Sequence, residues 1–565
     1  MNLNYKQKLI VGVTLLVVAC LIVTSVFVYY EYYEEEEPIE EELPDTEIDD
    51  RISPLTTQAV FFEVNRIRKK GIIDQVMNSG SNILKILPIR NVALYTILDG
   101  LLPGRGWDKK PIFDYVIVLD GYKWRTTKEF ETWDTDYINY ELFRRVEEEK
   151  PTVDIGFKLI DINKKLFSIK ESDADQFNIT YDFRTGRWSG DDEQNDSDGY
   201  GHFNGTNYEV WFSVKQTDYD ADGIPYWTEV NILGTDPTVD DSELDPDDDG
   251  IPTTWEWKWG YDPFKKDNHS ILDPDDDGLQ NTEEYFMEKW LANPYYPEIY
   301  IEADYMERTP LRPFELRIEQ GKLIPITRPR FVRTNYDGTV NIFQEEAQQL
   351  LIDRFNLHGI SVHIDDGCMG GGGEEIPFIP SGAYDQETGF FSEYYKNNFD
   401  DDRKGIFRYL ITAHSGGFAY PNDYKHYYDF MTCPSNTKFY AKYLSFALSA
   451  RAQSLGRAMQ VMHELGHTCG YLGNHSAGVD NTSSRYGNSP DYPWYDYVSC
   501  MNYDYFALRY FDYSDGTHGE YDTDDWAEID LGFFQRPSID MEGLGAEDFY
   551  SSTVLGSRYL HNIYE

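Results

Sequence analysis

Two histidines and a glutamate towards the C-terminal end of the chain have the spacing of a catalytic metal site. His463 and His467 lie four residues apart in the segment VMHELGHTCG, and Glu464 directly follows the first histidine. Residues at i and i+4 share one face of an α-helix, so both imidazoles can bind the same Zn²⁺ ion. Glu464 would then accept a proton from a water molecule that the metal activates. The segment predicts a zinc-dependent hydrolase.

A catalytic zinc site usually takes three ligands from the protein, and the sequence offers alternatives for the third. His475 lies in the loop after the predicted helix and is chemically the better zinc ligand. Asp480 lies in the same loop, and Gly478 just before it can turn the chain back towards the histidines. His518 is a more remote alternative. The sequence therefore leaves the choice between His475 and Asp480 open.

The same segment resembles the signature of the metzincin zinc peptidases, H-E-x-x-H-x-x-G-x-x-H. The chain departs from that signature at Gly473, which stands where the family has its third ligand and has no side chain to bind a metal. The resemblance implies a zinc endopeptidase that hydrolyses a protein or peptide substrate. The residues that match the signature are His463, Glu464, His467 and Gly470.

A second part of the resemblance lies downstream of the histidines. The segment SCMNY at 499–503 is similar to the Met-turn of metzincins and follows the histidines in the family's order. By this resemblance Met501 forms the hydrophobic base beneath the metal. Tyr503 corresponds to a tyrosine that binds zinc or stabilises the oxyanion in some members. Cys469 and Cys500 flank these motifs, and in an exported protein they are a candidate disulfide pair.

Three acidic segments, spaced by 27 and then 28 residues, each match the pattern D-x-D-x-D-G-x5-E. In such loops the carboxylates at positions 1, 3 and 5 converge on one Ca²⁺ ion, glycine at position 6 allows a sharp turn, and glutamate at position 12 completes the shell. Without a cation the clustered carboxylates would repel one another. The predicted calcium ligands are Asp218, Asp220, Asp222 and Glu229; Asp245, Asp247, Asp249 and Glu256; and Asp273, Asp275, Asp277 and Glu284.

These repeated loops resemble thrombospondin type 3 and dockerin-like calcium repeats, because their period is too short for paired EF-hands. We expect residues 217–292 to form a connector of three EF-hand-like calcium loops. Calcium would fold and stiffen this connector, since the free energy of metal binding is also free energy of folding.

The elements that must position the zinc ligands lie in residues 293–565. We expect an α/β or α+β metzincin-like domain there, because strand-like and helix-like runs alternate along the chain. A long helical pattern at 441–470 contains both histidines and ends at a glycine, which is typical of a helix stop. The other expected strands and helix lie at 298–306, 344–359, 360–367 and 405–417.

Two further regions precede the acidic loops. Residues 51–112 contain apolar side chains with helix-like spacing, which predicts a small helical region. Residues 113–216 contain alternating segments bounded by glycine, aspartate and asparagine. This second pattern predicts a β-rich, sandwich-like domain of antiparallel strands.

The N-terminal part of the chain has the pattern of a membrane anchor. Residues 9–30 carry no charged side chain and are long enough to span a bilayer as a helix. Lysines before this run and acidic residues after it predict that 1–30 is a cytoplasmic tip and transmembrane anchor, with the bulk of the chain extracellular. A cleaved signal peptide and a lipidated Cys20 are alternatives. The acidic residues 31–50 should form an extended stalk.

The charge of the chain limits its partners. With 100 acidic and 50 basic residues its net charge is -50, which argues against nucleic acid as a partner. The sequence therefore predicts a multidomain, single-pass, membrane-anchored zinc metalloendopeptidase of the cell surface, with Zn²⁺ and Ca²⁺ as cofactors. The rival interpretation is a calcium-stabilised surface adhesion or scaffold protein whose metallopeptidase domain is inactive.

Overall fold

The computed structural model of the chain divides into two compact units, residues 1–50 and residues 51–565. The helices and strands described below belong to the second unit. The described residues are 48–71, 110–165, 168–193, 199–307, 316–319, 322–325, 341–378, 394–413, 417–419, 428–434, 450–473, 475–481, 493–507 and 510–535.

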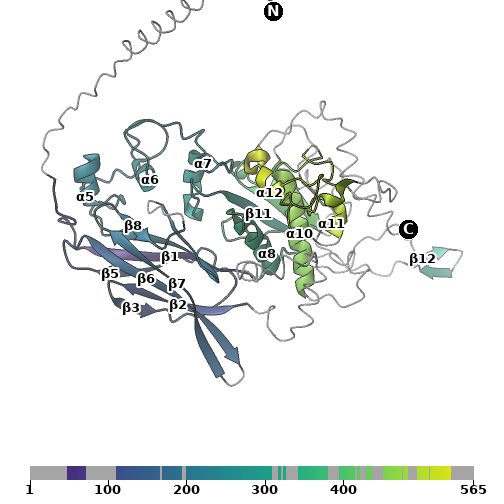
Figure 1. The fold of residues 1–565 in the computed structure, drawn as a ribbon, viewed down its shortest axis with the longest axis horizontal. Coiled ribbons are helices and arrows are strands. Elements are labelled where there is room, and N and C mark those ends of the chain that lie inside the picture. Colours follow the sequence, from purple (N-terminus) through teal and green to yellow (C-terminus); the bar gives the residue numbers. More distant parts are fainter. Residues whose placement is uncertain are drawn as a thin grey trace, which may run out of the picture. The chain divides into compact units, whose positions relative to one another are not determined.

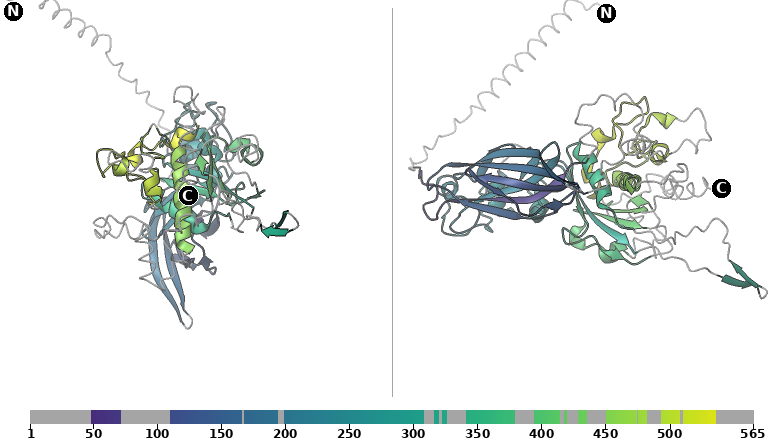
Figure 2. Two further views of the ribbon diagram at one scale, coloured as in Figure 1. Left: turned by 90° about the vertical axis from the view of Figure 1, so that its right-hand side faces the viewer. Right: turned by 90° about the horizontal axis from the view of Figure 1, so that it is seen from below.

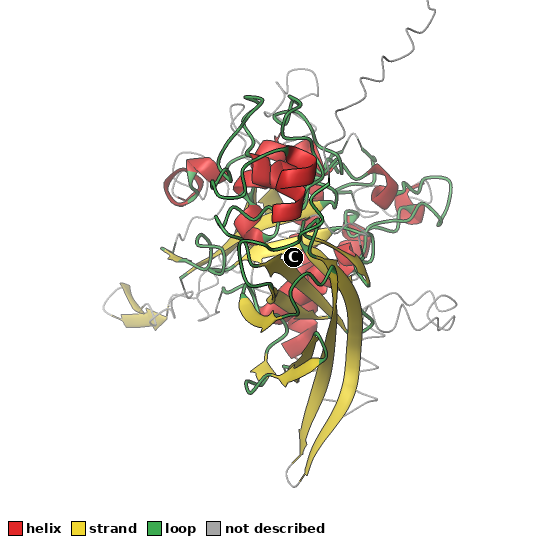
Figure 3. Cartoon of the chain, turned by 90° about the vertical axis from the view of Figure 1, so that its left-hand side faces the viewer, coloured by secondary structure: helices red, strands yellow, loops and turns green. Residues whose placement is uncertain are grey.

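Two antiparallel sheets are built from the chain up to residue 216 (Figure 1). The first has the strand order β5-β1-β10-β9, and the second has the order β3-β2-β6-β7-β8, with β4 pairing β2. Long strands β6 and β7 form the extended hairpin that is seen most clearly in Figure 3. The strands are β1 (Ala59–Lys69), β2 (Ile112–Leu119), β3 (Tyr122–Arg125), β4 (Phe130–Glu131), β5 (Tyr140–Arg145), β6 (Thr152–Lys165), β7 (Ser168–Asp182), β8 (Arg187–Gly190), β9 (Gly201–Asn204) and β10 (Tyr208–Gln216).

Phenylalanine rings fill the space between these two sheets. Phe62 and Phe212 come from the first sheet, and Phe157 and Phe177 come from the second. The ring centroids of Phe177 and Phe212 lie 5.1 Å apart, and those of Phe62 and Phe157 lie 6.1 Å apart. All four side chains are buried, so the burial of aromatic surface stabilises the packing of one sheet on the other.

The prediction of a helical region at 51–112 is wrong for its first part, which forms a strand. Ala59–Lys69 forms β1, which pairs with β10 on one side and with β5 on the other. A register shift between Val64 and Arg66 interrupts the two-residue period of the strand, and this irregularity gave its apolar residues a helix-like spacing. Residues 72–109 of the expected helical region lie outside the described residues.

The fold class expected from the sequence is wrong as a whole. The described residues form a mixed, sheet-rich structure with few helices, because strand pairing between distant segments overrides the local spacing on which helices are predicted. None of the helices in the described ranges is long and apolar enough to cross a membrane. The segment 9–30, expected to do so, lies outside the described residues, and so does most of the expected stalk at 31–50.

Short helices follow the two sheets along the chain, and the acidic loops lie before and between these helices (Figure 1). A small apolar cluster of Ile251, Trp255 and Trp259 supports the middle of this region. Burial of these indole rings compensates for the small amount of regular structure here. The elements are α5 (Tyr226–Thr228), η1 (Glu229–Leu233), α6 (Thr253–Lys258), α7 (Asn281–Phe286) and η2 (Glu288–Trp290).

A mixed sheet with the order β14-β11-β16-β18-β17 lies at the centre of the remaining residues. Strands β14, β11, β16 and β18 are parallel, whereas β17 is antiparallel to β18. Helices α8 and α10 pack on each other, α8 also contacts β14 and α10 also contacts β18 (Figure 2). The elements are β11 (Glu298–Met306), β12 (Leu316–Glu319), β13 (Lys322–Pro325), α8 (Glu345–Asn356), β14 (Ser361–Asp365), β15 (Glu375–Ile376), α9 (Lys396–Asn398), η4 (Asp401–Arg403), β16 (Arg408–Ala413), β17 (Phe418–Ala419), β18 (Phe430–Pro434), α10 (Ala450–Thr468), η7 (Pro493–Asp496), α11 (Tyr503–Ala507), α12 (Asp525–Glu528) and η8 (Leu531–Gln535).

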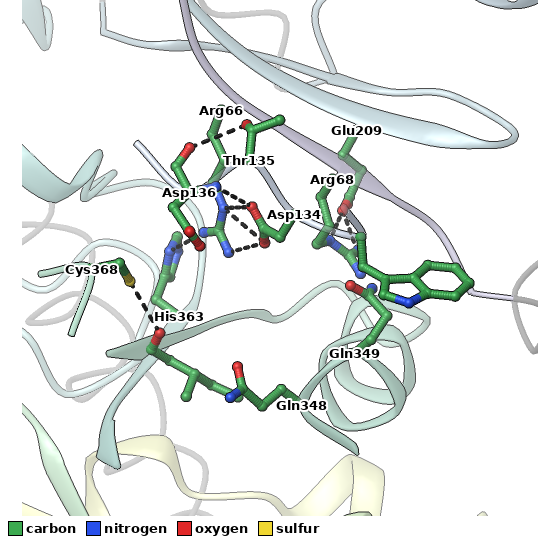
Figure 4. A network of polar contacts seen from close by, with 12 residues as sticks. Arg66, Arg68, Asp134, Thr135, Asp136, Glu209, Gln348, Gln349, His363 and Cys368 are labelled. Atoms are coloured by element: carbon green, nitrogen blue, oxygen red, sulfur yellow. Dashed lines mark hydrogen bonds and ion pairs between the residues drawn. The ribbon is translucent and has the colours of Figure 1, made fainter. Parts of the chain in front are cut away.

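A buried polar network joins β1 to α8 and to the mixed sheet (Figure 4). The Arg68 guanidinium forms ion pairs with Glu209 of β10 and, at 2.7 Å, with Asp353 of α8. Nη1 of Arg66 lies 3.0 Å from Nδ1 of His363 on β14. These side chains are buried, so the charge of Asp353 is neutralised only when the first sheet and α8 are in contact.

Replacing Arg68 with methionine is expected to lower the free energy of unfolding by about 3 kcal/mol, because Glu209 and Asp353 would stay buried without their partner. Chemical denaturation followed by tryptophan fluorescence measures this change. Lys164→Met is the control, since the side chains of Lys164 and its partner Glu129 are 45% and 43% exposed, and loss of this pair should change stability by less than about 1 kcal/mol. If Arg68→Met changes the free energy of unfolding as little as the control does, the network does not stabilise the unit.

Candidate metal centre

Helix α10 carries both predicted zinc-binding histidines on a buried face. The helix spans Ala450–Thr468 and ends where Gly470 adopts a left-handed conformation, with a φ angle of 93°. His463, Glu464 and His467 are 2%, 8% and 4% exposed. Their spacing along the helix places the imidazole centroids of the two histidines 5.0 Å apart. The helix therefore brings both rings to one buried position.

Backbone carbonyl groups hold the orientation of both imidazole rings. Nδ1 of His463 lies 2.9 Å from the carbonyl oxygen of Cys500, and Nδ1 of His467 lies 2.7 Å from that of Tyr471. A carbonyl oxygen only accepts hydrogen bonds, so each Nδ1 carries a proton and donates it. Each Nε2 is therefore left to bind a metal ion, or a second proton when no metal is bound.

Asp480 brings a carboxylate to these two Nε2 atoms. Its Oδ1 lies 3.1 Å from Nε2 of His463, and its Oδ2 lies 3.6 Å from Nε2 of His467. One donor atom from each of the three residues lies within 4.8 Å of the others, and all three residues are buried. Two imidazoles and a carboxylate form a donor set that Zn²⁺ accepts in catalytic sites. The residues present therefore fit zinc.

The loop after α10 is shaped so that Asp480 returns to the helix. The backbone N–H of Asp480 donates to the carbonyl oxygen of Met501 at 2.9 Å, which fixes the loop to the predicted Met-turn. Asp480 has a φ angle of 55°, a left-handed conformation that aspartate adopts more readily than most residues. A Cβ atom at Gly478 would lie 2.4 Å from Cδ1 of Tyr497, so glycine is needed for the loop to pass this ring.

The other two candidate ligands have different partners. Nε2 of His475 lies 3.1 Å from Oδ1 of Asp525, and Nδ1 of His518 lies 2.8 Å from Oδ2 of Asp522. Neither histidine belongs to the group of donor atoms that His463 and His467 form within the described part of the chain. Of the two alternatives that the sequence left open, the geometry therefore favours Asp480.

The charges at this centre depend strongly on one another. Burial lowers the pKa of His463, but the hydrogen bond and the charge of Asp480 outweigh burial and raise this pKa to about 9. Burial alone would raise the pKa of Asp480, whereas His467 and His463 lower it to about 2. Without a metal, a proton on His463 therefore balances the Asp480 carboxylate, and a cation that binds between them must displace that proton.

Glu464 differs from Asp480 because no imidazole contacts it closely enough to offset its burial. Burial raises the pKa of Glu464 to about 8, although the charge of His463 opposes this shift. A carboxylate with a raised pKa is a stronger base than one in water. Glu464 thus lies in a buried position beside the two histidines, where it can exchange a proton with a neighbouring group.

Met501 and Tyr503 both contact the centre. A Cβ atom at Gly466, between the two histidines, would lie 2.6 Å from Sδ of Met501, so the methionine packs directly against α10. The Tyr503 ring stacks on the imidazole of His463 with a centroid distance of 5.5 Å. The Tyr503 side chain also hydrogen-bonds to the Asp480 carboxylate and helps to lower the pKa of that group. Both residues therefore lie against the candidate metal ligands.

The disulfide that we considered between Cys469 and Cys500 is not formed. Cys469 and Cys500 are separate, buried thiols rather than a bonded pair. Burial raises the pKa of both thiols. They are therefore neutral, and they pack as small apolar side chains beside α10 and the predicted Met-turn.

The acidic loops share one backbone geometry. The glycine at the sixth position has a φ angle between 90° and 99° in each loop, a conformation that disfavours other residues. Its N–H donates to the aspartate at the first position, at 2.8 Å in the first and second loops and 3.0 Å in the third. This bond curls each loop around its own carboxylates. The three glycines are Gly223, Gly250 and Gly278.

Many carboxylate oxygens inside these loops have no hydrogen-bond partner. Both oxygens of the aspartate at the third position are buried and unpartnered in all three loops, namely in Asp220, Asp247 and Asp275. The glutamate at the twelfth position is at most 1% exposed in each loop. Buried carboxylates without donors destabilise a protein unless a cation binds them. The oxygen-rich donor sets of the first and third loops therefore fit Ca²⁺.

One contributor to the first loop was missed in the sequence. The Asp241 carboxyl lies within hydrogen-bonding distance of Asp222, and the residue is 7% exposed. Its Oδ1 has no hydrogen-bond partner. Asp241 lies beyond the twelve-residue pattern, so that pattern gives no signal for it. It adds a fifth carboxylate to the first loop.

Calcium removal should make the third loop sensitive to pH. Burial raises the pKa of Asp275 to about 9 and that of Asp277 to about 8, against about 4 in an unfolded chain. Because the folded-state pKa values are raised, the metal-free loop is most stable below about pH 4 and loses stability as the pH rises towards 8–9. In a chelator, limited proteolysis within 273–284 should therefore accelerate between about pH 5 and pH 9.

The cleavage rate of an unstructured reference peptide in the same samples corrects for the pH dependence of the protease. Excess calcium should remove the acceleration, since the ion replaces the protons that neutralise the carboxylates. A corrected rate in chelator that does not change with pH would contradict this prediction.

The candidate function therefore rests on the chain's own geometry. The four residues on which it rests are His463, Glu464, His467 and Asp480, which lie together and are buried. No protein-family model matches the chain, and no curated protein matches it either.

Proposed function

We propose that the chain is a zinc metalloendopeptidase that hydrolyses a protein or peptide substrate. The observation that carries this proposal is the convergence of Nε2 of His463 and Nε2 of His467 on the carboxylate of Asp480, with Glu464 beside them on the same helix. A structural zinc site needs no neighbouring base, whereas hydrolysis needs a group that moves protons. The resemblance of the motif and of SCMNY to metzincins supports a peptide substrate.

The chain's own residues account for the proton transfers. Zinc, when bound by the two histidines and Asp480, would supply the Lewis acidity that activates water and polarises a carbonyl group. Glu464 would take a proton from the attacking water and deliver it to the leaving amine. Tyr503, which lies against His463, would donate a hydrogen bond to the oxyanion of the tetrahedral intermediate. Met501 would support the ligands from below through its contact with α10.

The carbonyl groups of Cys500 and Tyr471 have a separate role in this proposal. Each accepts a hydrogen bond from a histidine Nδ1 and so keeps the opposite nitrogen directed at the metal. The same bonds raise the basicity of the imidazoles as ligands. The predicted Met-turn thereby acts on the metal ligands through its backbone as well as through Met501.

We further infer that calcium binds the first and third acidic loops and stabilises the region between the antiparallel sheets and the mixed sheet. The third loop is tied to β11, because the N–H of Glu298 donates to Oδ2 of Asp277 at 2.8 Å. A Cβ atom at Gly278 would lie 2.3 Å from Cα of Gly532, so this loop also packs tightly on η8. Calcium would thus stiffen a segment that contacts the proposed catalytic part directly.

The proposal is tested on the purified chain in calcium-containing buffer. Bound zinc is measured by mass spectrometry, and casein hydrolysis is measured before and after treatment with a zinc chelator that leaves calcium bound. We expect zinc in the preparation, hydrolysis that the chelator stops, and recovery when zinc is returned. A chain that holds zinc without hydrolysing casein or a library of peptides would favour the calcium-stabilised scaffold instead.

A further inference from the structure

An imidazole from a later segment contacts the second acidic loop. Nε2 of His269 lies 3.3 Å from Oδ2 of Asp249 and 3.5 Å from Oε1 of Glu256. The side chains of all three residues are 0% exposed. One donor atom from each lies within 4.8 Å of the others, as is needed to bind a single ion. His269 lies outside the twelve-residue pattern and was not among the ligands predicted from the sequence.

Two members of this group have buried atoms without a hydrogen-bond partner, whereas Asp249 accepts hydrogen bonds from the backbone N–H groups of Ile251 and Asp267. Nε2 of His269 and both carboxylate oxygens of Glu256 are buried and have no hydrogen-bond partner. The distances from Nε2 to the two carboxylates exceed those of good N–H···O hydrogen bonds. A cation shared by the imidazole and the two carboxylates would hold them together more strongly than these long contacts do.

The side-chain amide of Asn281 contacts the second ring nitrogen of His269. The amide nitrogen of Asn281 lies 2.8 Å from Nδ1 of His269, and the buried amide oxygen has no hydrogen-bond partner. The oxygen and nitrogen of an amide can exchange places by rotation. With the oxygen towards His269, Nδ1 carries the proton and Nε2 directs its lone pair at Asp249 and Glu256. The rotated amide would place an oxygen at Nδ1 of His269, as backbone carbonyl groups do at Nδ1 of His463 and His467.

In each acidic loop, the aspartate at the fifth position contacts a different kind of chemical group from outside the loop. Asp222 of the first loop receives the carboxyl of Asp241. Asp277 of the third loop receives the backbone N–H of Glu298. Asp249 of the second loop receives an imidazole. Only this loop of the three therefore combines nitrogen and oxygen donors.

The donor chemistry separates the second loop from the other two. Calcium binds oxygen ligands, whereas imidazole with carboxylates suits first-row transition metals. Rings of Trp255 and Tyr261 meet His269 edge to face, with centroid distances of 5.9 and 4.8 Å. This apolar cover limits access of water, as expected for a structural ion. We propose that Asp249, Glu256 and His269 form a second transition-metal site, distinct from the centre on α10 and independent of peptidase activity.

The test counts cobalt ions bound by the full chain in the presence of millimolar calcium. Calcium occupies the oxygen-only loops, and unbound Co²⁺ is removed before mass spectrometry. The wild-type chain should retain about two cobalt ions, one at each proposed transition-metal site. His269→Asp should retain about one, because it gives the second loop an oxygen set like that of the first loop with Asp241. The centre on α10 is intact in both proteins and contributes equally.

Two matched glutamate substitutions keep the test informative if the His269→Asp variant does not fold. Glu256→Gln should lose the same cobalt ion, whereas Glu229→Gln, at the equivalent position of the first loop, should keep the wild-type count. Thermal unfolding shows whether each variant is folded. The proposal is overturned if the wild-type chain holds only the ion of the α10 centre, or if folded His269→Asp and Glu256→Gln both keep the wild-type cobalt count.

Discussion

Glu464→Gln is expected to lower kcat/KM for a peptide substrate by about 10²–10⁴-fold while zinc remains bound. Glutamine has nearly the same shape as glutamate but cannot accept the proton of the attacking water. Glu464 lies on α10 beside His463, and it is not one of the three residues whose donor atoms converge. Its substitution should therefore remove proton transfer without removing a ligand.

The measurement pairs zinc content with steady-state kinetics on the same preparation. Glu528→Gln is a suitable control, because Glu528 is 59% exposed and lies near His475 rather than near the proposed metal. That control should retain full activity and zinc. Unchanged hydrolysis by Glu464→Gln would remove the proposed general base, and loss of zinc from this variant would assign Glu464 a role as ligand.

Asp480→Ala is expected to weaken zinc binding by more than about 100-fold, whereas His475→Ala should retain zinc. Loss of groups that merely orient a ligand weakens binding by about 10–100-fold, so removal of a ligand should exceed that range. Asp480 is also the group that balances the charge of His463. His475 lies 3.1 Å from Asp525 instead, and its loss should reduce stability through that contact.

Competition with a chromophoric zinc chelator measures both affinities. Asp480→Asn adds a second comparison, because an amide keeps the size of the side chain but is a poorer ligand for zinc. Zinc affinity that falls for His475→Ala and not for either Asp480 variant would reverse the assignment of the third ligand.

The part of the site that lies on one helix was predictable from the sequence. His463 and His467 follow the period of a helix, and a helix of this length positions i and i+4 side chains without help from the rest of the fold. Asp480 lies on a loop, where no period relates a residue to a direction in space. The return of this loop depends on the fit of Gly478 against the ring of Tyr497, which is a tertiary contact.

The fold was less predictable than the site, for the same physical reason. The strand at 59–69 contains a register shift and buried arginines, so it lacks the alternation by which a strand is recognised. Arg68 is buried because it meets Glu209 and Asp353, which lie far away in the sequence. Local composition marks such a residue as exposed, and only its distant partners explain why it is not.

The acidic loops illustrate both outcomes. In the first loop the four carboxylates of the twelve-residue pattern lie together, because they all come from one short segment. His269 and Asp241 reach the second and first loops from later segments. Whether an oxygen or a nitrogen completes each loop is thus decided outside the pattern that identifies it.

The contact between Arg68 and Asp353 has a consequence for the biosynthesis of the chain. These residues are separated by 285 positions, which a ribosome takes roughly 15–60 s to translate. During that interval Arg68 cannot form its ion pair with Asp353, and the surface of the first sheet that α8 later covers is exposed. We therefore expect the nascent N-terminal half to depend on chaperones until α8 has emerged, and to acquire protection from proteases late and together with the half that contains α8 and α10.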